Sequence, residues 1–424
     1  MILSPRDTFR EGQDVTIMIP ISEALQHITK HTPVVGSEKI SLHDAVGRVL
    51  AEDIVADMDL PPFDRSQMDG FAVRSEDVNN TPVELKIAGE SAAGNGWHHK
   101  MKKGQAVRIM TGAPVPGGAD TVQKVELTSE ASFASEVAQL TNGKITILES
   151  IAAGKNIVLR GAEVKKGEHI LTAGERITER MIATLAAFSY KKVKVAKQPR
   201  VSILTTGSEV VEIDDKPGRD QIRNSNSVML EALTIATGGK PKLLPSTSDD
   251  LKSIKKVIAK SAKKSDVVVI TGGVSVGKYD LTKKALVELG AKIYFDQVRL
   301  KPGKPAVFAT LGKTIVFGLP GNPVSAAVTF YLFVRKALLM MQNAREVDLR
   351  RGTAIAGGTL TAARERDTYL PAKLNFTEDA QVTATPLKWV GSSDFIGFAQ
   401  ADALAFVPRS GRIEKGELAE ILFL

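Results

Sequence analysis

Three glycine-rich loops, each directly after a short apolar run, are the segments of this chain best suited to chemistry. They span residues 205–209 (TTGSE), 271–277 (TGGVSVG) and 318–323 (GLPGNP). Parallel strands buried between helices read as continuous apolar runs, so the three preceding runs predict neighbouring strands of one sheet. Ligands of open α/β sheets bind beyond the carboxyl ends of the strands. We therefore expect the loops to meet, with bare backbone N–H groups that hold a phosphate or another oxyanion.

Acidic residues accompany two of these loops. Asp280 comes three residues after Gly277, and Glu209 ends the first loop. A carboxylate beside a phosphate site commonly binds Mg²⁺, so the two residues are candidates to share one cation. The residues alone leave simpler interpretations open, in which Asp280 caps a tight turn and Glu209 is an exposed acid in a first helical turn. The second loop also lacks the Gly-Lys-Ser/Thr ending of a Walker A motif.

Basic and hydroxyl side chains in other loops add to this set. Lys301 and Lys304 flank a Pro-Gly turn (KPGKP), which suits an oxyanion or pyrophosphate unless the turn is simply solvated. Asp69 lies in a proline-flanked loop (PPFDRSQMDG), and Thr111 follows a short apolar run at a turn (RIMTGAPVP). Loops carry binding and catalytic residues more often than cores do, although Asp-Gly is also an ordinary turn.

The composition excludes several classes of function. With 43% hydrophobic and 25% charged residues, the chain reads as a soluble globular protein. It has no cysteine, which excludes disulfides and thiolate nucleophiles, and all six histidines precede residue 170, which excludes a Ser-His-Asp mechanism in the half with the glycine loops. The net charge of +8 fits a solvated basic surface or the attraction of small anions. Few aromatics accompany the basic residues, so nucleic acid is not an expected partner.

Neither a membrane span nor a signal peptide is expected. No stretch approaches the roughly 20 uncharged apolar residues that a transmembrane helix needs, and the N-terminus lacks an apolar signal core. We therefore expect a cytoplasmic protein.

Changes along the chain in the pattern of apolar runs and turn residues predict an α/β multidomain protein. Strands alternating with helices predict a doubly wound α/β domain, and short strands between Gly, Pro and Asn turns predict β-rich domains. The expected parts are an N-terminal extension (1–17), a discontinuous mixed domain (18–60 and 150–190), an inserted β-rich domain (61–149), the α/β domain (191–345) and a C-terminal β-barrel (346–424).

Helices are expected at four places near these boundaries. One begins near Ile21, a second occupies residues 40–60, and a third lies around ERMIATLAAFSY. The fourth follows GLPGNP and continues to about Met341, with Asn322 as its cap and Pro323 in its first turn.

Taken together, these segments resemble the molybdopterin molybdenumtransferase family, which includes MoeA-like proteins and the gephyrin E domain. The resemblance runs from about Ile19 to Leu424. It implies a MoaB/Mog-like α/β domain, a four-part subunit, and an elongated homodimer whose active sites are lined by both subunits. The matching motifs are PPFDRSQMDGFAV, RIMTGAPVPGGAD, GxNIxxRG (154–161), TTGSE, TGGVSVGKYD, LKPGKP and GLPGNPVSA.

The resemblance also implies a reaction. Adenylylated molybdopterin binds, molybdate is inserted at its dithiolene with the help of Mg²⁺, and AMP leaves as molybdenum cofactor forms. Protein partners would be a molybdopterin adenylyltransferase and molybdoenzyme apoproteins. The alternatives are a divergent paralogue that uses tungstate, a gephyrin-like scaffold, and an enzyme acting on another nucleotide pyrophosphate.

Site residues carried over by the resemblance fall into two groups. The first, catalytic group is Asp69, Thr111, Glu209, Asp249 and Asp280. Within it, Asp280 and Glu209 are the metal candidates. The substrate- and anion-binding group is Gly207, Ser208, Gly272, Gly273, Ser275, Gly277, Lys301, Lys304, Pro320, Gly321, Asn322, Pro323 and Ser392.

Two positions depart from the family pattern. Gln297 stands where the family often has a lysine, and Pro371 stands where it often has an arginine. Only Lys373 or Arg366 lies near enough in sequence to replace that arginine. Each charge-assisted hydrogen bond is worth roughly 1.5–3 kcal/mol, so the loss of two cations would weaken an oxyanion site.

Overall fold

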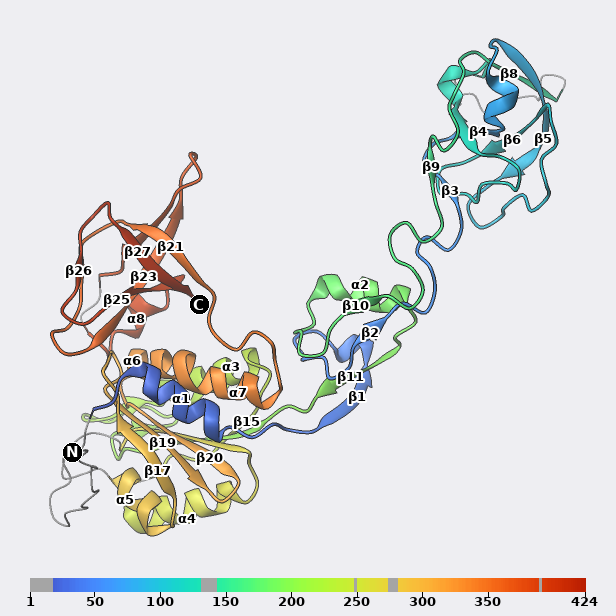
Figure 1. Ribbon diagram of the computed structural model, residues 1–424. Coiled ribbons are helices and arrows are strands. Elements are labelled where there is room, and N and C mark those ends of the chain that lie inside the picture. Colours follow the sequence, from blue (N-terminus) through green and yellow to red (C-terminus); the bar gives the residue numbers. More distant parts are fainter. Residues whose placement is uncertain (1–17, 131–142, 248–249, 274–280, 389–390) are drawn as a thin grey trace, which may run out of the picture. The chain divides into compact units, whose positions relative to one another are not determined.

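The computed structural model describes residues 18–130, 143–247, 250–273, 281–388 and 391–424 (Figure 1). The chain forms two compact units. The larger unit comprises Met1–Glu52, Ala173–Ile182 and Lys191–Leu424, and the smaller unit comprises Asp53–Thr172 and Ala183–Tyr190. Four of the predicted site residues lie outside the described residues, namely Asp249, Ser275, Gly277 and Asp280.

A six-stranded sheet is the centre of the larger unit. It has the order β15-β12-β16-β20-β19-β17, and all of its strands are parallel except β19. The expected parallel α/β sheet is therefore confirmed, with one antiparallel strand added by the β19–β20 hairpin. The strands are β12 (Arg200–Thr205), β15 (Lys240–Leu243), β16 (Val267–Thr271), β17 (Lys292–Gln297), β19 (Pro305–Leu311) and β20 (Thr314–Leu319).

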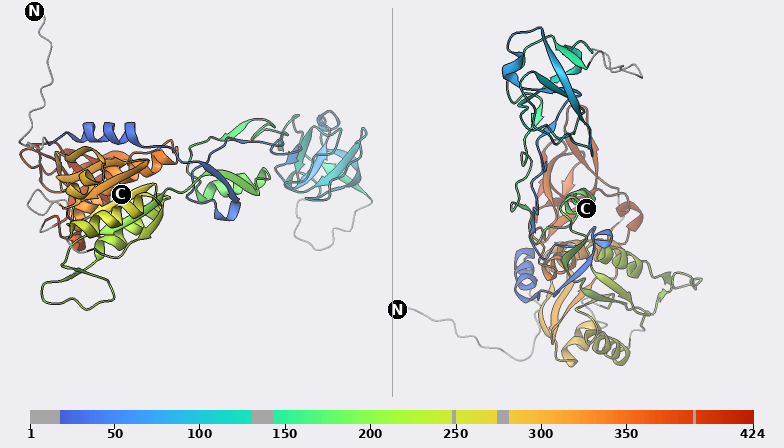
Figure 2. Two further views of the ribbon diagram at one scale, coloured as in Figure 1. Left: turned by 90° about the horizontal axis from the view of Figure 1, so that it is seen from below. Right: turned by 90° about the vertical axis from the view of Figure 1, so that its right-hand side faces the viewer.

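Helices cover both faces of this sheet (Figures 1 and 2). One face packs against α1 (Ile21–His31), α3 (Ser225–Ala236) and the helical segment that follows β20. The other face packs against α4 (Leu251–Ala262) and α5 (Leu281–Glu288). The central strands are buried on both sides, which explains why they read as unbroken apolar runs.

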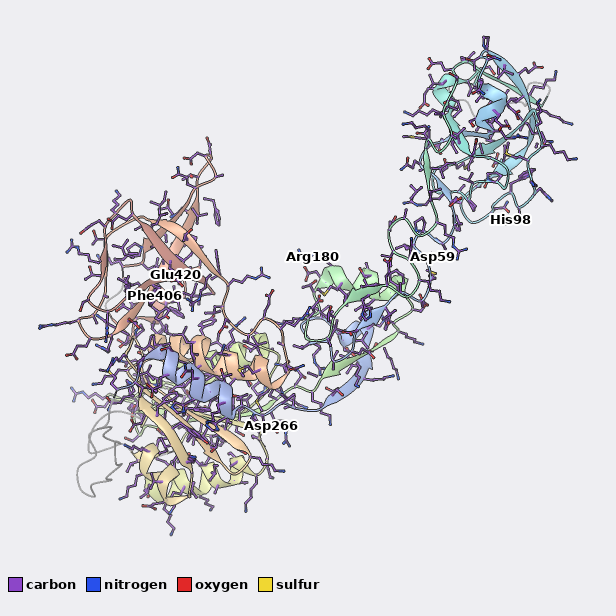
Figure 3. The ribbon with its side chains drawn as sticks, in the orientation of Figure 1. Asp59, His98, Arg180, Asp266, Phe406 and Glu420 are labelled. Carbon is purple, nitrogen blue, oxygen red and sulfur yellow. The ribbon has the colours of Figure 1, made fainter. Side chains whose placement is uncertain are left out.

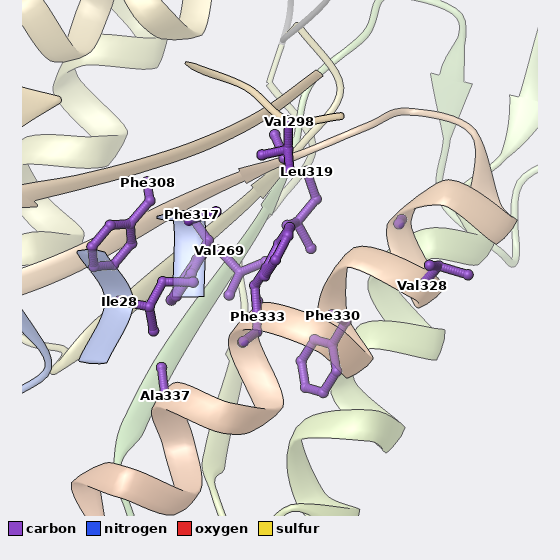
Figure 4. Close-up of a cluster of buried hydrophobic side chains, with 14 of the residues drawn as sticks. Ile28, Val269, Val298, Phe308, Phe317, Leu319, Val328, Phe330, Phe333 and Ala337 are labelled. Carbon is purple, nitrogen blue, oxygen red and sulfur yellow. The ribbon is translucent and has the colours of Figure 1, made fainter. Parts of the chain in front are cut away.

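The segment after β20 is a core helix. It consists of α6 (Pro323–Thr329), a π-helical turn (Phe330–Val334) and α7 (Arg335–Met341). It is long and apolar enough to cross a membrane, but 72% of its apolar window is buried inside the protein. Phe330 and Phe333 lie in the same buried cluster as Phe308 and Phe317 of the sheet (Figure 4).

A five-stranded barrel forms the C-terminal part of the larger unit. Its strands follow the order β23-β24-β21-β27-β25, and the pairing of β25 with β23 closes the ring, as expected. The short β18 (Leu300–Lys301) pairs with β23, so the KPGKP turn is attached to the barrel. The remaining elements are β21 (Arg351–Ala356), β22 (Leu360–Thr361), β23 (Asp367–Phe376), β24 (Val382–Pro386), α8 (Phe395–Phe398), β25 (Ala403–Val407), β26 (Arg412–Ile413) and β27 (Leu418–Phe423).

The smaller unit is mostly β, as its short apolar runs predict. Its main sheet has the order β7-β4-β6-β5-β8. These strands are β4 (Gly70–Val73), β5 (Val83–Ser91), β6 (Gln105–Ile109), β7 (Thr121–Lys124) and β8 (Lys144–Ile147). Shorter elements are β2 (Ile54–Val55), β3 (Arg65–Ser66), β9 (Ile157–Val158), β10 (His169–Leu171) and the 3-10 turns Ser75–Val78 and Val125–Leu127.

The helix predicted over residues 40–60 is wrong. This segment contains β1 (Ser37–Ser41), a 3-10 turn (Leu42–Asp44) and β2. Ile40 pairs with Val193 of β11 (Lys192–Ala196), so its apolar side chain belongs to a strand and not to a helix. Gly47 has φ of 81°, which no right-handed helix accommodates. The helix expected around residue 180 is confirmed as α2 (Glu179–Ala187). Two further short strands are β13 (Val210–Val211) and β14 (Ile222–Arg223).

Candidate active site

The three central strands end level with one another at the same edge of the sheet. Thr205 of β12 pairs with Thr271 of β16, which pairs with Leu319 of β20. The backbone N–H of Gly272 donates to the carbonyl of Leu319 at 3.2 Å. The described parts of the three loops therefore meet, as the sequence predicts.

Glycine is required where two of these loops touch. Gly272 has φ of 89°, and a Cβ added there would lie 2.3 Å from the carbonyl oxygen of Thr206. At Gly273, with φ of 62°, a Cβ would lie 2.9 Å from the hydroxyl oxygens of both Thr206 and Thr282. Side chains at these positions would both strain the backbone and collide with the neighbouring loop.

Asn226, which is not among the predicted site residues, joins two of the loops by hydrogen bonds. From the first turn of α3, its Nδ2 donates to Thr271 Oγ1 at 3.0 Å and to the carbonyl of Gly321 at 2.7 Å. Thr271 Oγ1 in turn donates to the carbonyl of Pro320 at 2.9 Å. The available signal was the polar run Asn-Ser-Asn-Ser at a helix start, where only capping is usually expected.

Unpartnered buried oxygens gather at the same edge. Within the described residues, Thr206 Oγ1, Asn226 Oδ1 and Thr282 Oγ1 are buried without a hydrogen-bond partner. Buried polar atoms are rarely left unpaired, so the edge retains hydrogen-bonding capacity that a ligand or water can use.

A pocket of about 380 Å³ lies between this edge and the barrel. Five of the predicted anion-binding residues line it, and Gly321 and Pro323 adjoin two of them in the chain. The lining residues are Lys301, Pro302, Gly303, Lys304, Pro305, Pro320, Asn322, Ser325, Arg366, Gly391 and Ser392. We call this cavity the lysine pocket.

Three cationic side chains give the lysine pocket its chemistry. Among the described residues, Lys301, Lys304 and Arg366 have no carboxylate within ion-pair distance. Positive charges without counter-ions, next to the hydroxyls of Ser325 and Ser392, suit a tetrahedral oxyanion or a phosphate.

The structure distinguishes between the two residues considered as replacements for the missing arginine. Arg366 lines the lysine pocket. Lys373 instead pairs with Asp402 at 3.0 Å, and the pKa of Asp402 is lowered, first by the backbone N–H of Leu374 and then by that lysine. Gln297 is buried in β17 and does not line the pocket.

Asn322 does not cap α6 with its side chain, contrary to expectation. Its Nδ2 donates to Ser392 Oγ at 2.7 Å, while Pro323 occupies the first turn as predicted. The carbonyl of Ser392 also accepts a hydrogen bond from the backbone N–H of Val324 at 3.1 Å. The loop after β20 is therefore tied to the residues before α8.

The first loop lies at the same sheet edge without lining the lysine pocket. Glu209 and Ser208 are exposed. A Cβ placed on Gly207, which has φ of 141°, would lie 2.6 and 2.7 Å from the two carboxylate oxygens of Glu209. The Glu209 carboxylate therefore folds back over Gly207.

Asp250, next to the predicted Asp249, has a structural role. Its carboxylate accepts hydrogen bonds from the backbone N–H groups of Lys252 and Ser253 and caps α4. The hydrogen bond with the Ser253 side chain is the largest cause that lowers the pKa of Asp250, followed by that with the Ser253 backbone. This carboxylate therefore stays ionised to lower pH than an ordinary aspartate.

Asp69 and Thr111 form a contact in the smaller unit. Asp69 Oδ1 accepts hydrogen bonds from the backbone N–H of Thr111 at 2.7 Å and from its hydroxyl at 2.9 Å. Strands β4 and β6 bring them together, since Gly70 pairs with Ile109. Gly70 cannot be replaced easily, because a Cβ there would lie 2.0 Å from the carbonyl oxygen of Gln123.

Comparison with known proteins gives a consistent result. Residues 19–189 match the MoeA N-terminal region (domains I and II), residues 202–340 match a probable molybdopterin binding domain, and residues 353–424 match the MoeA C-terminal region (domain IV). The chain is 34% identical over 409 residues to molybdopterin molybdenumtransferase of Staphylococcus aureus (strain COL), which covers 95% of both chains. A Staphylococcus epidermidis protein of the same name is 33% identical over 411 residues, again covering 95% of both chains.

A solved structure agrees over the whole chain. The molybdopterin biosynthesis MoeA protein from Pyrococcus horikoshii OT3 superimposes with a TM-score of 0.81 at 31% identity, covering 96% of this chain and all of that one. The chain therefore belongs to the molybdopterin molybdenumtransferase (MoeA) family of enzymes of molybdenum cofactor biosynthesis.

Proposed function

We propose that the chain inserts molybdate into adenylylated molybdopterin and releases AMP. The observation that carries this proposal is the lysine pocket, in which three unpaired cations lie beside the glycine loops of an α/β sheet. Molybdate is a tetrahedral dianion, and the adenylylated substrate carries a pyrophosphate, so both substrates need positive charge at one place.

Lys301, Lys304 and Arg366 bind the oxyanion in this proposal. Lysine acts as a point charge, whereas the guanidinium group of arginine donates two parallel hydrogen bonds to two oxygens. Ser392 is held next to them by Asn322 and donates its hydroxyl to an oxygen of the bound anion. Arg366 supplies the charge that Pro371 lacks.

The backbone of the glycine loops holds the pyrophosphate part of the substrate. Gly272 and Gly273 have no side chain to keep an anion away from their N–H groups. The buried oxygens of Thr206, Asn226 and Thr282 add acceptors and hydroxyl donors for polar groups on the same substrate. This arrangement fixes the position of the bond that breaks.

Mg²⁺ is proposed as the cation that assists the reaction. The exposed carboxylate of Glu209 and the unpartnered oxygens at the same sheet edge are hard oxygen donors, which is the ligand type that Mg²⁺ takes. Glu209, with Asp280, would hold the ion. Bound there, Mg²⁺ would neutralise charge on the pyrophosphate. The hydroxyl of Thr111, oriented by Asp69, is proposed to contact the substrate.

We also propose that the enzyme acts in the cytoplasm as a homodimer that receives its substrate from a molybdopterin adenylyltransferase. Light scattering of the purified chain tests the dimer, and a mass of one 45.5 kDa subunit would contradict it. Delivery of cofactor to molybdoenzyme apoproteins is the corresponding downstream step.

The decisive experiment is a product assay. Purified protein is incubated with adenylylated molybdopterin and Mg²⁺, with molybdate or tungstate in parallel, and AMP and the metal-containing cofactor are measured. We expect AMP release that depends on the oxyanion and on Mg²⁺. Hydrolysis of the substrate without any oxyanion dependence would contradict the proposal, and a preference for tungstate would identify the other metal as the substrate.

A matched pair of variants connects the assay to the lysine pocket. Lys304→Ala removes one unpaired cation of the lysine pocket. Lys415→Ala removes an exposed lysine of the C-terminal barrel that does not line this pocket. We expect the first variant to raise the KM for molybdate about tenfold or more, since each charge-assisted hydrogen bond is worth roughly 1.5–3 kcal/mol. Equal KM values for the two variants would show that the oxyanion binds elsewhere.

A further inference from the structure

A second and larger pocket lies at the opposite edge of the same sheet. Its volume is about 680 Å³. Arg200 begins β12 and Asp266 directly precedes β16, so the pocket lies where the strands start, whereas the lysine pocket lies where they end. Figure 3 shows Asp266 on this part of the molecule. A six-residue strand spans roughly 20 Å, so one small ligand cannot occupy both pockets.

The second pocket carries excess positive charge. Lys197 and Lys313 line it, and within the described part of the chain neither ammonium group has a partner. Arg200 also lines it, but this guanidinium pairs with Asp266, with Nε–Oδ2 at 3.1 Å and Nη2–Oδ1 at 2.9 Å. Since the Asp266 carboxylate is engaged by Arg200, the two lysines remain uncompensated.

Polar and apolar walls face these lysines. His31 contributes an imidazole whose ring stacks on Tyr294, with centroids 4.0 Å apart and an interplanar angle of 20°. Val34, which is 65% exposed, and the half-buried Val35 supply apolar surface. The pocket therefore combines charge for an anionic group with apolar surface for a neutral part of the same ligand.

We propose that this second pocket binds a small phosphorylated molecule of nucleotide size. Unpaired lysines bind phosphate as point charges, and the volume lies within the range of small-molecule sites. A nucleoside monophosphate and an inorganic pyrophosphate share this chemistry. The site is separate from the proposed catalytic reaction, because none of its lining residues lines the lysine pocket.

The test is a binding titration in which the two lysines of the lysine pocket are reversed in charge and the second pocket is intact. The full chain with K301E and K304E is titrated calorimetrically with AMP, inorganic pyrophosphate and inorganic phosphate, and the titrations are repeated after adding K197E and K313E. We expect saturable binding to the first protein and at least a tenfold weaker affinity in the second, since two charge-assisted contacts are reversed. All four lysines are partly or fully exposed, and equal melting temperatures verify that the variants fold.

The comparison of ligands identifies which part of the pocket is used. Tighter binding of AMP than of phosphate, weakened by Val34→Asp for AMP alone, shows that the apolar wall holds a nucleoside. Equal affinities that K197E and K313E abolish identify a phosphate site. Affinities that K197E and K313E leave unchanged, or no saturable binding of any of the three anions, would overturn the proposal. Each result is read from the change that K197E and K313E cause, and neither residue belongs to the proposed catalytic site, so the outcome is independent of the proposed catalytic function.

Discussion

Asn322 Nδ2 donates to Ser392 Oγ at 2.7 Å, and this contact joins the loop after β20 to the segment that precedes α8. The Asn322 side chain makes no capping hydrogen bond to α6, so the start of that helix has no side-chain cap. The hydroxyl of Ser392 keeps its own proton free to donate into the lysine pocket. The bond therefore positions a polar group instead of stabilising a helix.

A double-mutant cycle on this pair tests the positioning. Ser392→Ala and Asn322→Ala are each expected to lower kcat/KM, and the double variant to lose less than the sum, with a coupling of about 0.5–1.5 kcal/mol. Product formation at subsaturating molybdate is the measurement. Additive losses would show that the two side chains act independently.

Replacing Arg366 should affect oxyanion binding more than stability. The side chain is partly exposed and has no counter-ion among the described residues, so Arg366→Ala removes no folded-state ion pair. We expect the KM for molybdate to rise about tenfold or more while the melting temperature stays within about 1 °C. Lys373→Ala is the control, because that lysine pairs with Asp402 outside the pocket. A larger KM effect for Lys373→Ala would reverse the assignment.

The contact between Asp69 and Thr111 allows a graded test in the smaller unit. Asp69→Asn keeps a side-chain oxygen that can accept from Thr111, whereas Asp69→Ala removes both hydrogen bonds. We expect activity in the order wild type, Asp69→Asn, Asp69→Ala if the carboxylate serves to orient the threonine. Steady-state AMP release measures this order. Equal losses in the two variants would instead indicate that the negative charge itself is required.

Much of this architecture was predictable because its signals are local. Unbroken apolar runs identified the central strands, and turn residues identified the β-rich parts, since buried strands and tight turns impose their own residue types. The segment 40–60 was mispredicted because its apolar residues pair with strands far along the chain: Ile40 pairs with β11, and Ile54 of β2 pairs with β10. A local pattern contains no information about such a partner.

The candidate active site was likewise predictable where its signals are local and unpredictable where they depend on distant residues. Lys301, Lys304 and Asn322 belong to recognisable motifs and do line one pocket. Asn226 was missed because its importance comes from the distant acceptors Thr271 and Gly321, which only folding brings within reach. The side-chain partner of Asn322 was unpredictable for the same reason, since Ser392 belongs to another domain.

Asn226→Asp should be more destabilising than its small change in size suggests. The carboxylate loses the NH₂ donors for the Gly321 carbonyl and Thr271 Oγ1, and it places a negative charge against a carbonyl oxygen. Unsatisfied buried groups cost about 1–3 kcal/mol each, so we expect a clear fall in the free energy of unfolding. Denaturant titration measures it, and Asn375→Asp at an exposed strand position is the control. Equal stability of the two variants would mean that Asn226 does not hold the loops.

The pair of Arg200 and Asp266 should determine part of the acid stability. Burial alone raises the pKa of Asp266, but hydrogen bonds and charge from Arg200 outweigh it and hold this pKa below 3.8. A carboxyl group whose pKa is lower in the folded state stabilises the protein above its unfolded value of 3.8, and this stability is lost as the pH falls through the folded pKa. In Arg200→Gln the charge of Arg200 no longer opposes the effect of burial on the pKa of Asp266, so this carboxyl should protonate at higher pH in the variant.

We therefore expect the acid-unfolding midpoint of Arg200→Gln to shift to higher pH, as measured by melting temperature between pH 2 and pH 7. Arg350→Gln is a matched control, because Arg350 forms a 3.8 Å ion pair with Glu346 in which both side chains are at least 80% exposed. Exposed pairs of this kind contribute little to stability, so the control should follow the wild-type curve. Coincident curves for all three proteins would show that Asp266 is not held ionised by Arg200, and that its carboxylate is free to offset the lysines of the second pocket.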